Sequence, residues 1–161
     1  MNKKRAGIAA AITAAVLVLG FILYNQVIPG KYIPADDEIA LHIQLDTKED
    51  IGLLVFDYRA DGYEYSGGIA NADKSLLKRH SSDIVEVWDK QELNGSSDTV
   101  ELSIQFRIIT EYVDPNYENV YPEEITKYIQ EPIAWKARYG ESYSIIISGD
   151  MTNGYKAFLE E

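Results

Sequence analysis

The segment Val100-Glu101-Leu102-Ser103-Ile104-Gln105-Phe106-Arg107-Ile108 decides the fold class. Apolar and polar residues alternate over its whole length, which is the period of a strand with one buried and one solvated face. Phe106 then belongs to the buried set and Gln105 to the solvated set. The pattern predicts a long, half-buried strand in an antiparallel sheet.

Segments with the same period lie on both sides of this strand. They are residues 39–45, 51–58, 63–69 and 84–88 before it, and residues 133–139, 143–148 and 155–159 after it. Asp61-Gly62 and Asn153-Gly154 separate two pairs of these segments, and both dipeptides are typical of hairpin turns. Seven or eight strands without a β-α-β rhythm predict a mainly β domain. We expect an antiparallel β-sandwich of immunoglobulin-like architecture, with a small barrel as the alternative.

Helical patterns are weak in this part of the chain. In residues 122–131 a proline at the first turn, two glutamates beside the positive dipole end and an apolar stripe predict one short helix. In residues 71–82 Asn71 is a possible helix cap, and we expect one or two helical turns there, with a loop as the alternative. The expected domain therefore contains one or two short helices.

The N-terminus carries a membrane-targeting pattern. Lys3, Lys4 and Arg5 precede 19 uncharged, mostly apolar residues that run from Ala6 to Tyr24. As a helix these residues would be roughly 28 Å long, which is enough to cross the hydrocarbon core. The end of the run is bulky and lacks the small residues of a signal-peptidase site, so we expect a retained transmembrane helix, with a cleaved signal as the alternative.

The distribution of charge around this helix predicts its orientation. The cationic start indicates a cytoplasmic tail at residues 1–5, an anchor or uncleaved signal at residues 6–24 and an extracytoplasmic remainder. Residues 25–38, with two prolines and a glycine, predict a stalk, and residues 39–161 predict one extracytoplasmic domain. The expected location is the cell membrane, crossed once, with the domain outside.

The part of the chain beyond the stalk is strongly acidic. Of the 15 lysines and arginines four precede Tyr32, which leaves 11 against 26 aspartates and glutamates and a formal balance of −15. Nucleic acid is therefore not an expected partner. The chain has no cysteine, which excludes acylation as a lipoprotein, disulfides and thiol chemistry.

Catalytic and cofactor motifs are absent from the sequence. It contains neither His-Glu-x-x-His nor Gly-x-Ser-x-Gly, and it has no phosphate-binding glycine loop. The two histidines, His42 and His80, fall at positions that predict surface or edge residues. We therefore expect no catalytic residue, no cofactor and no metal site that the sequence alone would identify.

The loop of residues 112–121 is the candidate binding site. Its tyrosines offer stiff faces for sugar rings or apolar side chains, and its carboxylates and amide offer directional hydrogen bonds. Alternatively, the tyrosines pack over one end of the sandwich and the polar residues form turns. Its resemblance to an EF-hand loop fails at Asn119 and Ile125, where a glycine and an acid belong. The candidate residues are Tyr112, Asp114, Asn116, Tyr117, Glu118 and Tyr121.

These observations favour a membrane-anchored binding module of a bacterial cell envelope, with a protein or carbohydrate partner. One alternative is a small hydrolase of cell-wall polymer that uses a carboxylate pair. Such an enzyme needs an acid of raised pKa beside an ionised partner in a cleft. A second alternative is a structural or sensor subunit whose anchor pairs with another membrane helix.

Overall fold

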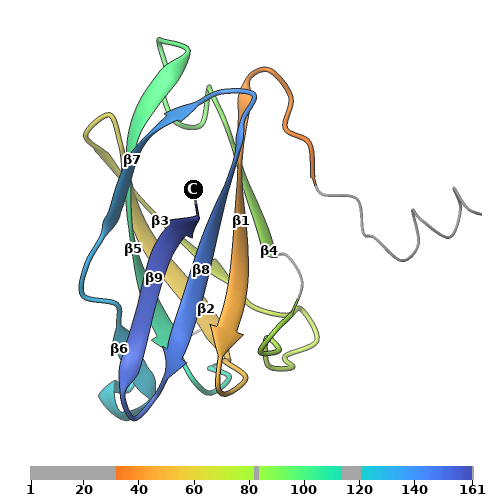
Figure 1. Cartoon of the computed structure of the whole chain (residues 1–161), viewed down its shortest axis with the longest axis vertical. Helices are drawn as coiled ribbons and strands as arrows, with labels where there is room; N and C mark the ends of the chain where they lie inside the picture. Colours follow the sequence, from red (N-terminus) through yellow and green to blue (C-terminus); the bar gives the residue numbers. More distant parts are fainter. Residues whose placement is uncertain (1–31, 82–83, 114–120, 161) are drawn as a thin grey trace, which may run out of the picture. The chain divides into compact units, whose positions relative to one another are not determined.

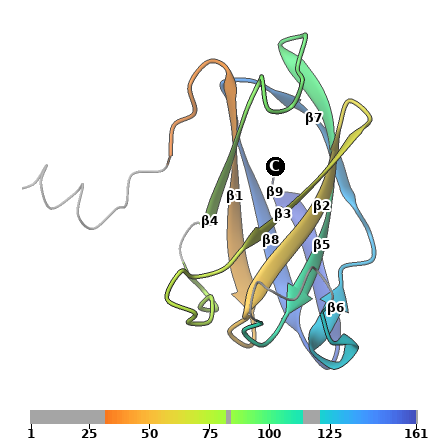
Figure 2. The same cartoon turned by 180° about the vertical axis from the view of Figure 1, so that it is seen from behind.

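The computed structural model describes residues 32–81, 84–113 and 121–160 of the 161-residue chain. The predicted tail, the predicted anchor and the first half of the predicted stalk, residues 25–31, lie outside these residues. Ile33–Glu161 form one compact unit. Within the described residues this unit is mainly β and consists of two sheets (Figure 1, Figure 2), consistent with a β-sandwich. No helix in this part of the chain is long and apolar enough to cross a membrane.

The first sheet has four strands in the order β4-β1-β8-β9. The β1/β4 and β8/β9 pairs are antiparallel, whereas β1 and β8 run parallel, with Ala40 opposite Ser142. The prediction of a wholly antiparallel sandwich is therefore wrong at this one pair. Its two strands are far apart in sequence, so no turn between them fixes their relative direction. The strands are β1 (Glu38–Thr47), β4 (Ile84–Asp89), β8 (Ser142–Asp150) and β9 (Gly154–Glu160).

The second sheet is antiparallel and has the order β3-β2-β5-β6, with β7 also paired to β5. The alternating segment that decided the fold class lies in β5, which has neighbours on both edges. The prediction of a long strand is thus confirmed. The strands are β2 (Leu53–Ala60), β3 (Tyr63–Ile69), β5 (Thr99–Ile109), β6 (Thr126–Tyr128) and β7 (Ile133–Arg138).

Large side chains from both sheets form one core. Phe106 of β5 is 1% exposed, and its ring lies 6.1 Å from that of Phe56 on β2, centroid to centroid. Trp88 of β4 in the first sheet stacks on Tyr58 of β2 in the second sheet at 4.8 Å. Since aromatic pairs add about 0.5–1.5 kcal/mol to the burial of their area, the stack of Trp88 on Tyr58 ties the two sheets together. Phe106 lies on the buried face, as the alternation predicted.

The predicted hairpin turn between β2 and β3 is confirmed. Asp61 and Gly62 both have positive φ, 48° and 91°, as a two-residue type I′ turn requires. The carboxylate of Asp61 also accepts a hydrogen bond from the backbone N–H of Glu101 on β5, at 2.9 Å. The turn is therefore fixed to the central strand of its sheet.

The predicted helix in residues 122–131 is wrong. The structure has a single 3-10 turn, η1 (Glu123–Ile125), followed by β6. β7 pairs only with the first half of β5, so the second half offers free backbone groups on that edge. Thr126 pairs with Ile109 there, and the N–H of Ile129 donates to the carbonyl of Phe106 at 2.9 Å. Pairing with the central strand thus replaces the local helical preference.

Neighbouring strands determine the structure of residues 71–81 and the burial of His42. Residues 71–81 form a loop with turns, in which Leu77 bridges to Ile51, so the expectation of one or two helical turns is wrong for these residues and the loop alternative is correct. His42 is buried with 3% exposure, so the prediction of a surface or edge histidine is wrong for it. It lies on β1, which has β4 and β8 on its two edges, with Val85 and Ser144 directly opposite.

Candidate functional site

The sequence-predicted binding loop begins after β5. The structure describes two of its candidate residues, Tyr112 and Tyr121, and both are half-buried. The Nζ of Lys74 lies 5.6 Å from the centroid of the Tyr112 ring, so this tyrosine contacts the loop that follows β3. The binding role of the loop stays a prediction, because the other four candidates lie outside the described residues: Asp114, Asn116, Tyr117 and Glu118.

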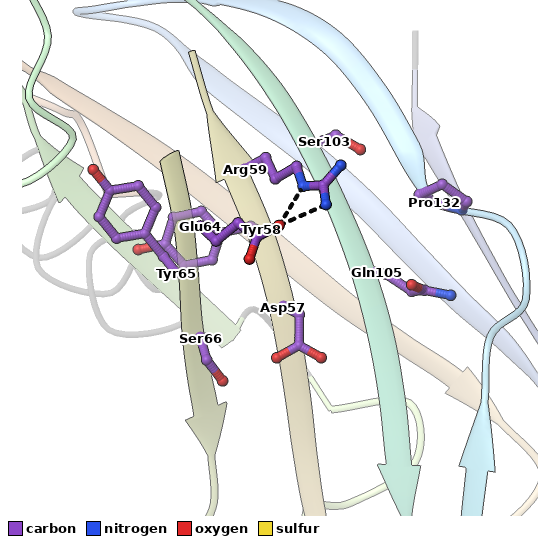
Figure 3. Close-up of a pocket in the computed structure, with 9 residues that line it drawn as sticks. All are labelled: Asp57, Tyr58, Arg59, Glu64, Tyr65, Ser66, Ser103, Gln105 and Pro132. Carbon is purple, nitrogen blue, oxygen red and sulfur yellow. Dashed lines mark hydrogen bonds and ion pairs between the residues drawn. The ribbon is translucent and has the colours of Figure 1, made fainter. Parts of the chain in front are cut away.

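A polar groove lies on the outer face of the second sheet (Figure 3). Its volume is about 560 Å³. Side chains of a strand alternate between its two faces. Because Tyr58 and Ala60 of β2 face the core, Asp57 and Arg59 face outward. The groove is therefore built on the solvated side of the same strands that form the core. Its polar side chains are Asp57, Arg59, Glu64, Ser66, Ser103 and Gln105, and Pro132 borders it.

Strand register arranges these six side chains in two rows across three strands. In one row Asp57 of β2 lies opposite Ser66 of β3 and Gln105 of β5. In the other row Arg59 of β2 lies opposite Glu64 of β3 and Ser103 of β5. Directly opposite side chains are about 5 Å apart at Cβ, so each row presents a continuous set of polar groups.

Two arginines hold the carboxylates of the groove. Arg59 donates to Oε1 of Glu64 through Nε at 3.0 Å and Nη2 at 2.6 Å (Figure 3). Arg107 lies 3.1 Å from Oδ2 of Asp57 through Nη2, and its guanidinium carbon lies 5.8 Å from the centroid of the Tyr128 ring. The first pair is 67% and 72% exposed, so it contributes little to stability. Both pairs nevertheless orient charged groups at fixed places on a rigid sheet.

The chemistry of the groove is that of hydrogen bonding. Carboxylates accept, guanidinium groups donate, and the serine hydroxyls and the glutamine amide do both. Pockets for apolar small molecules are lined mostly by hydrophobic residues, whereas six of the nine residues that line this groove are polar or charged. The arrangement therefore suits a ligand that is rich in hydroxyl or amide groups.

A carboxyl of raised pKa, which the hydrolase alternative requires, lies elsewhere. Burial, and then the nearby charge of Glu92, raise the pKa of Glu86 on β4. Glu86 lies opposite Leu41 of β1 on the core side of the first sheet, and it does not line the polar groove. An inward-pointing charge on an edge strand is a common device against edge-to-edge pairing. Within the described residues, no group of three or more His, Cys, Asp or Glu is placed to hold a metal ion.

Sequence reasoning missed this groove. Ser103 and Gln105 were assigned to the solvated face of their strand, but a solvated face is the ordinary outcome of alternation. The rows form only through the register of β2 with β3 and β5, which joins residues up to about 50 positions apart. The turn at Asp61-Gly62 could have given the β2/β3 half of the register, since a two-residue turn places Arg59 opposite Glu64.

Comparisons with known proteins provide no relative. No protein-family model and no curated protein matches the chain. One solved structure, described as "Trapped Toxin", is 11% identical to it with a TM-score of 0.31, over 76% of this chain and 22% of that one. This chain thus spans about a fifth of the length of that structure's chain. The likeness is too weak to carry an argument about function.

Proposed function

We propose that the protein is a single-pass, membrane-anchored binding module of a bacterial cell envelope. In this proposal residues 6–24 anchor the chain, residues 1–5 stay in the cytoplasm, and an immunoglobulin-like sandwich binds its ligand outside. The cationic start, the uncharged run and the balance of −15 beyond residue 31 support this topology. The ligand is held without covalent change.

One observation carries the binding role: the two rows of polar side chains on the outer face of the second sheet. A sheet positions side chains more firmly than a loop does, and the two arginine pairs orient the charged members. Neutral hydroxyl-rich chains are bound through such sets of donors and acceptors. We therefore propose a glycan of the envelope as the ligand of this groove.

The hydrolase alternative is less well supported. The two carboxylates in the groove, Asp57 and Glu64, are both held in ion pairs with arginines. A general acid needs a raised pKa so that it keeps its proton near neutral pH. The groove thus offers acceptors and donors for recognition, whereas the carboxyl of raised pKa, Glu86, lies in the other sheet.

Co-sedimentation with purified peptidoglycan tests the groove. The full chain in mild detergent is compared with the double variant Glu64→Gln, Ser66→Ala. The matched control is Glu141→Gln, Ser142→Ala, because Glu141 is also an exposed glutamate beside an arginine and Ser142 is also exposed. We expect the groove variant to bind about tenfold more weakly or worse, since hydrogen bonds to charged groups contribute about 1.5–3 kcal/mol. Equal binding by the two double variants would show that the polar groove is not the binding site for peptidoglycan.

Membrane extraction and protease access test the topology separately. The full chain should stay in the membrane fraction after an alkaline carbonate wash, and external protease should cleave it beyond residue 31 on intact protoplasts. Recovery of a soluble form that begins near residue 21 or later would show that the segment is a cleaved signal. That result would leave the binding role of the groove open to its own test.

A further inference from the structure

A second groove lies along one flank of the domain, between the two sheets. Among the described residues, β9 is the last strand of the first sheet and pairs there with β8 alone, while β6 pairs with β5 at the other sheet's edge (Figure 1). Residues of β6 and β9 line this flank groove, which has a volume of about 570 Å³. An edge strand presents unpaired N–H and C=O groups along its free side. The flank groove therefore contains backbone that can accept another strand.

Exposed aromatic side chains border the flank groove. Tyr128 at the end of β6 is 61% exposed and Phe158 of β9 is 48% exposed. Large apolar side chains left in solvent at a concave site mark interaction surfaces more often than isolated ones do. They provide the apolar contacts that an added strand would need for its own side chains.

The lysine side chains that make no ion pair or ring contact in the described residues lie at the same groove. The described residues include 11 lysines and arginines. Nine of them make an ion pair, a hydrogen bond to a backbone carbonyl or a contact with an aromatic ring. The remaining two, Lys127 and Lys156, both line the flank groove, where Glu131 supplies one opposing charge. In a domain that is otherwise acidic, this groove carries a local excess of positive charge.

We propose that the flank groove binds an extended, acidic peptide segment of a partner protein, which pairs with β9 as an added strand. The main chain of the segment bonds to the free edge of β9, and this part of the interaction is independent of sequence. The ammonium groups of Lys127 and Lys156 then select carboxylates, and Tyr128 and Phe158 cover its apolar side chains. Other residues line the polar groove on the sheet face, so this inference does not depend on the proposed glycan site.

The charge of the domain argues against a second copy as the occupant. Two copies would each bring the same strongly negative balance, and two β9 edges would bring their Lys156 side chains toward each other. An anionic polymer would satisfy the lysines but has no peptide groups for the edge of β9. An acidic peptide satisfies the backbone and the charges together.

Fluorescence anisotropy tests the proposal with the full chain in mild detergent at low ionic strength. The probe is a labelled peptide of about eight residues, a typical strand length, that alternates valine with glutamate. We expect it to bind, and we expect Lys127→Glu with Lys156→Glu to weaken binding about tenfold or more. The matched control is Lys78→Glu with Lys136→Glu, two exposed lysines outside the groove, which should stay within about twofold of wild type.

Two further peptides separate charge from strand pairing. A valine–lysine peptide should not bind, and a valine–glutamate peptide with alternate backbone nitrogens methylated should bind about tenfold more weakly or worse. Equal binding of the methylated peptide would overturn the proposal, because charge alone would then explain the affinity. No binding of the valine–glutamate peptide up to about 1 mM would also overturn the proposal. The two lysines would then serve to prevent edge-to-edge pairing of β9 with other strands. If the chain instead associates with itself and Lys156→Glu abolishes that association, the occupant of the flank groove is a second copy of the chain.

Discussion

Truncation of Phe106 tests the arrangement of the core. Its side chain is 1% exposed and contacts the ring of Phe56, so Phe106→Ala removes a buried ring and one aromatic pair. Burial of a phenylalanine side chain contributes about 1.5–3 kcal/mol and the pair about 0.5–1.5 kcal/mol. The cavity left behind adds to the loss, so we expect about 3–5 kcal/mol less free energy of unfolding.

The adjacent residue provides the control. Gln105 faces outward, and its amide nitrogen donates only long hydrogen bonds, to the carbonyls of Ile129 at 3.3 Å and Gln130 at 3.4 Å. Gln105→Ala should therefore reduce the free energy of unfolding by less than about 1 kcal/mol.

Urea denaturation of the full chain in mild detergent measures both effects, with the fluorescence of Trp88 and Trp135 as the signal. Both tryptophans belong to strands of the domain, so they report its unfolding. For a domain of this size the Phe106 variant should also melt roughly 12–20 °C lower. Equal losses for the two variants would refute the assignment of Phe106 to the core. A changed urea slope with an unchanged free energy would place the effect in the denatured state.

Three more predictions concern single side chains. Gly67→Ala should destabilise the domain by about 1–3 kcal/mol in urea denaturation, because a Cβ there would lie 2.6 Å from the Phe56 ring, whereas Gly68→Ala, with 3.6 Å to its nearest atom, should have a smaller effect. A hydrogen bond from the side chain of Lys48 is the main cause that lowers the pKa of Asp150, so the domain should lose stability as pH falls below about 4. Asp150→Asn should flatten this pH dependence of stability between about pH 2 and 5, and an unchanged slope would contradict the prediction. Burial raises the pKa of Tyr58, so the unfolded state ionises first and stability should fall as pH rises above about 10; Tyr58→Phe should reduce that fall, measured by thermal melting between about pH 8 and 11.

Local patterns predicted the elements whose structure is decided locally. Alternation located β5 and β3, because a strand with one buried face needs an apolar residue at every second position. Asp61-Gly62 predicted its hairpin because that dipeptide tolerates positive φ at both positions. The same alternation assigned Phe106 to the buried face, where the structure places it.

Features that depend on distant partners were not predictable from local patterns. The segment at 122–131 has a helical composition, yet the open edge of β5 takes residues 126–128 as a strand. The direction of β8 beside β1 and the rows of the polar groove likewise depend on pairing between strands that no local pattern records. The flank groove was missed because Lys127 and Lys156 are ordinary surface lysines until the sheets bring β6 and β9 together.

The parallel pairing of β1 with β8 also determines the order in which the domain can form. β4 can pair with one edge of β1 early, but Ser142, the partner of Ala40 on the other edge, follows it by about a hundred residues. The hairpin of β2 and β3 needs only its own turn, so it can form while the chain is still emerging. The first sheet can close only after the last hairpin is complete. A contact of such long range makes folding slow, and it leaves the apolar residues of β1 in need of protection until synthesis has delivered β8.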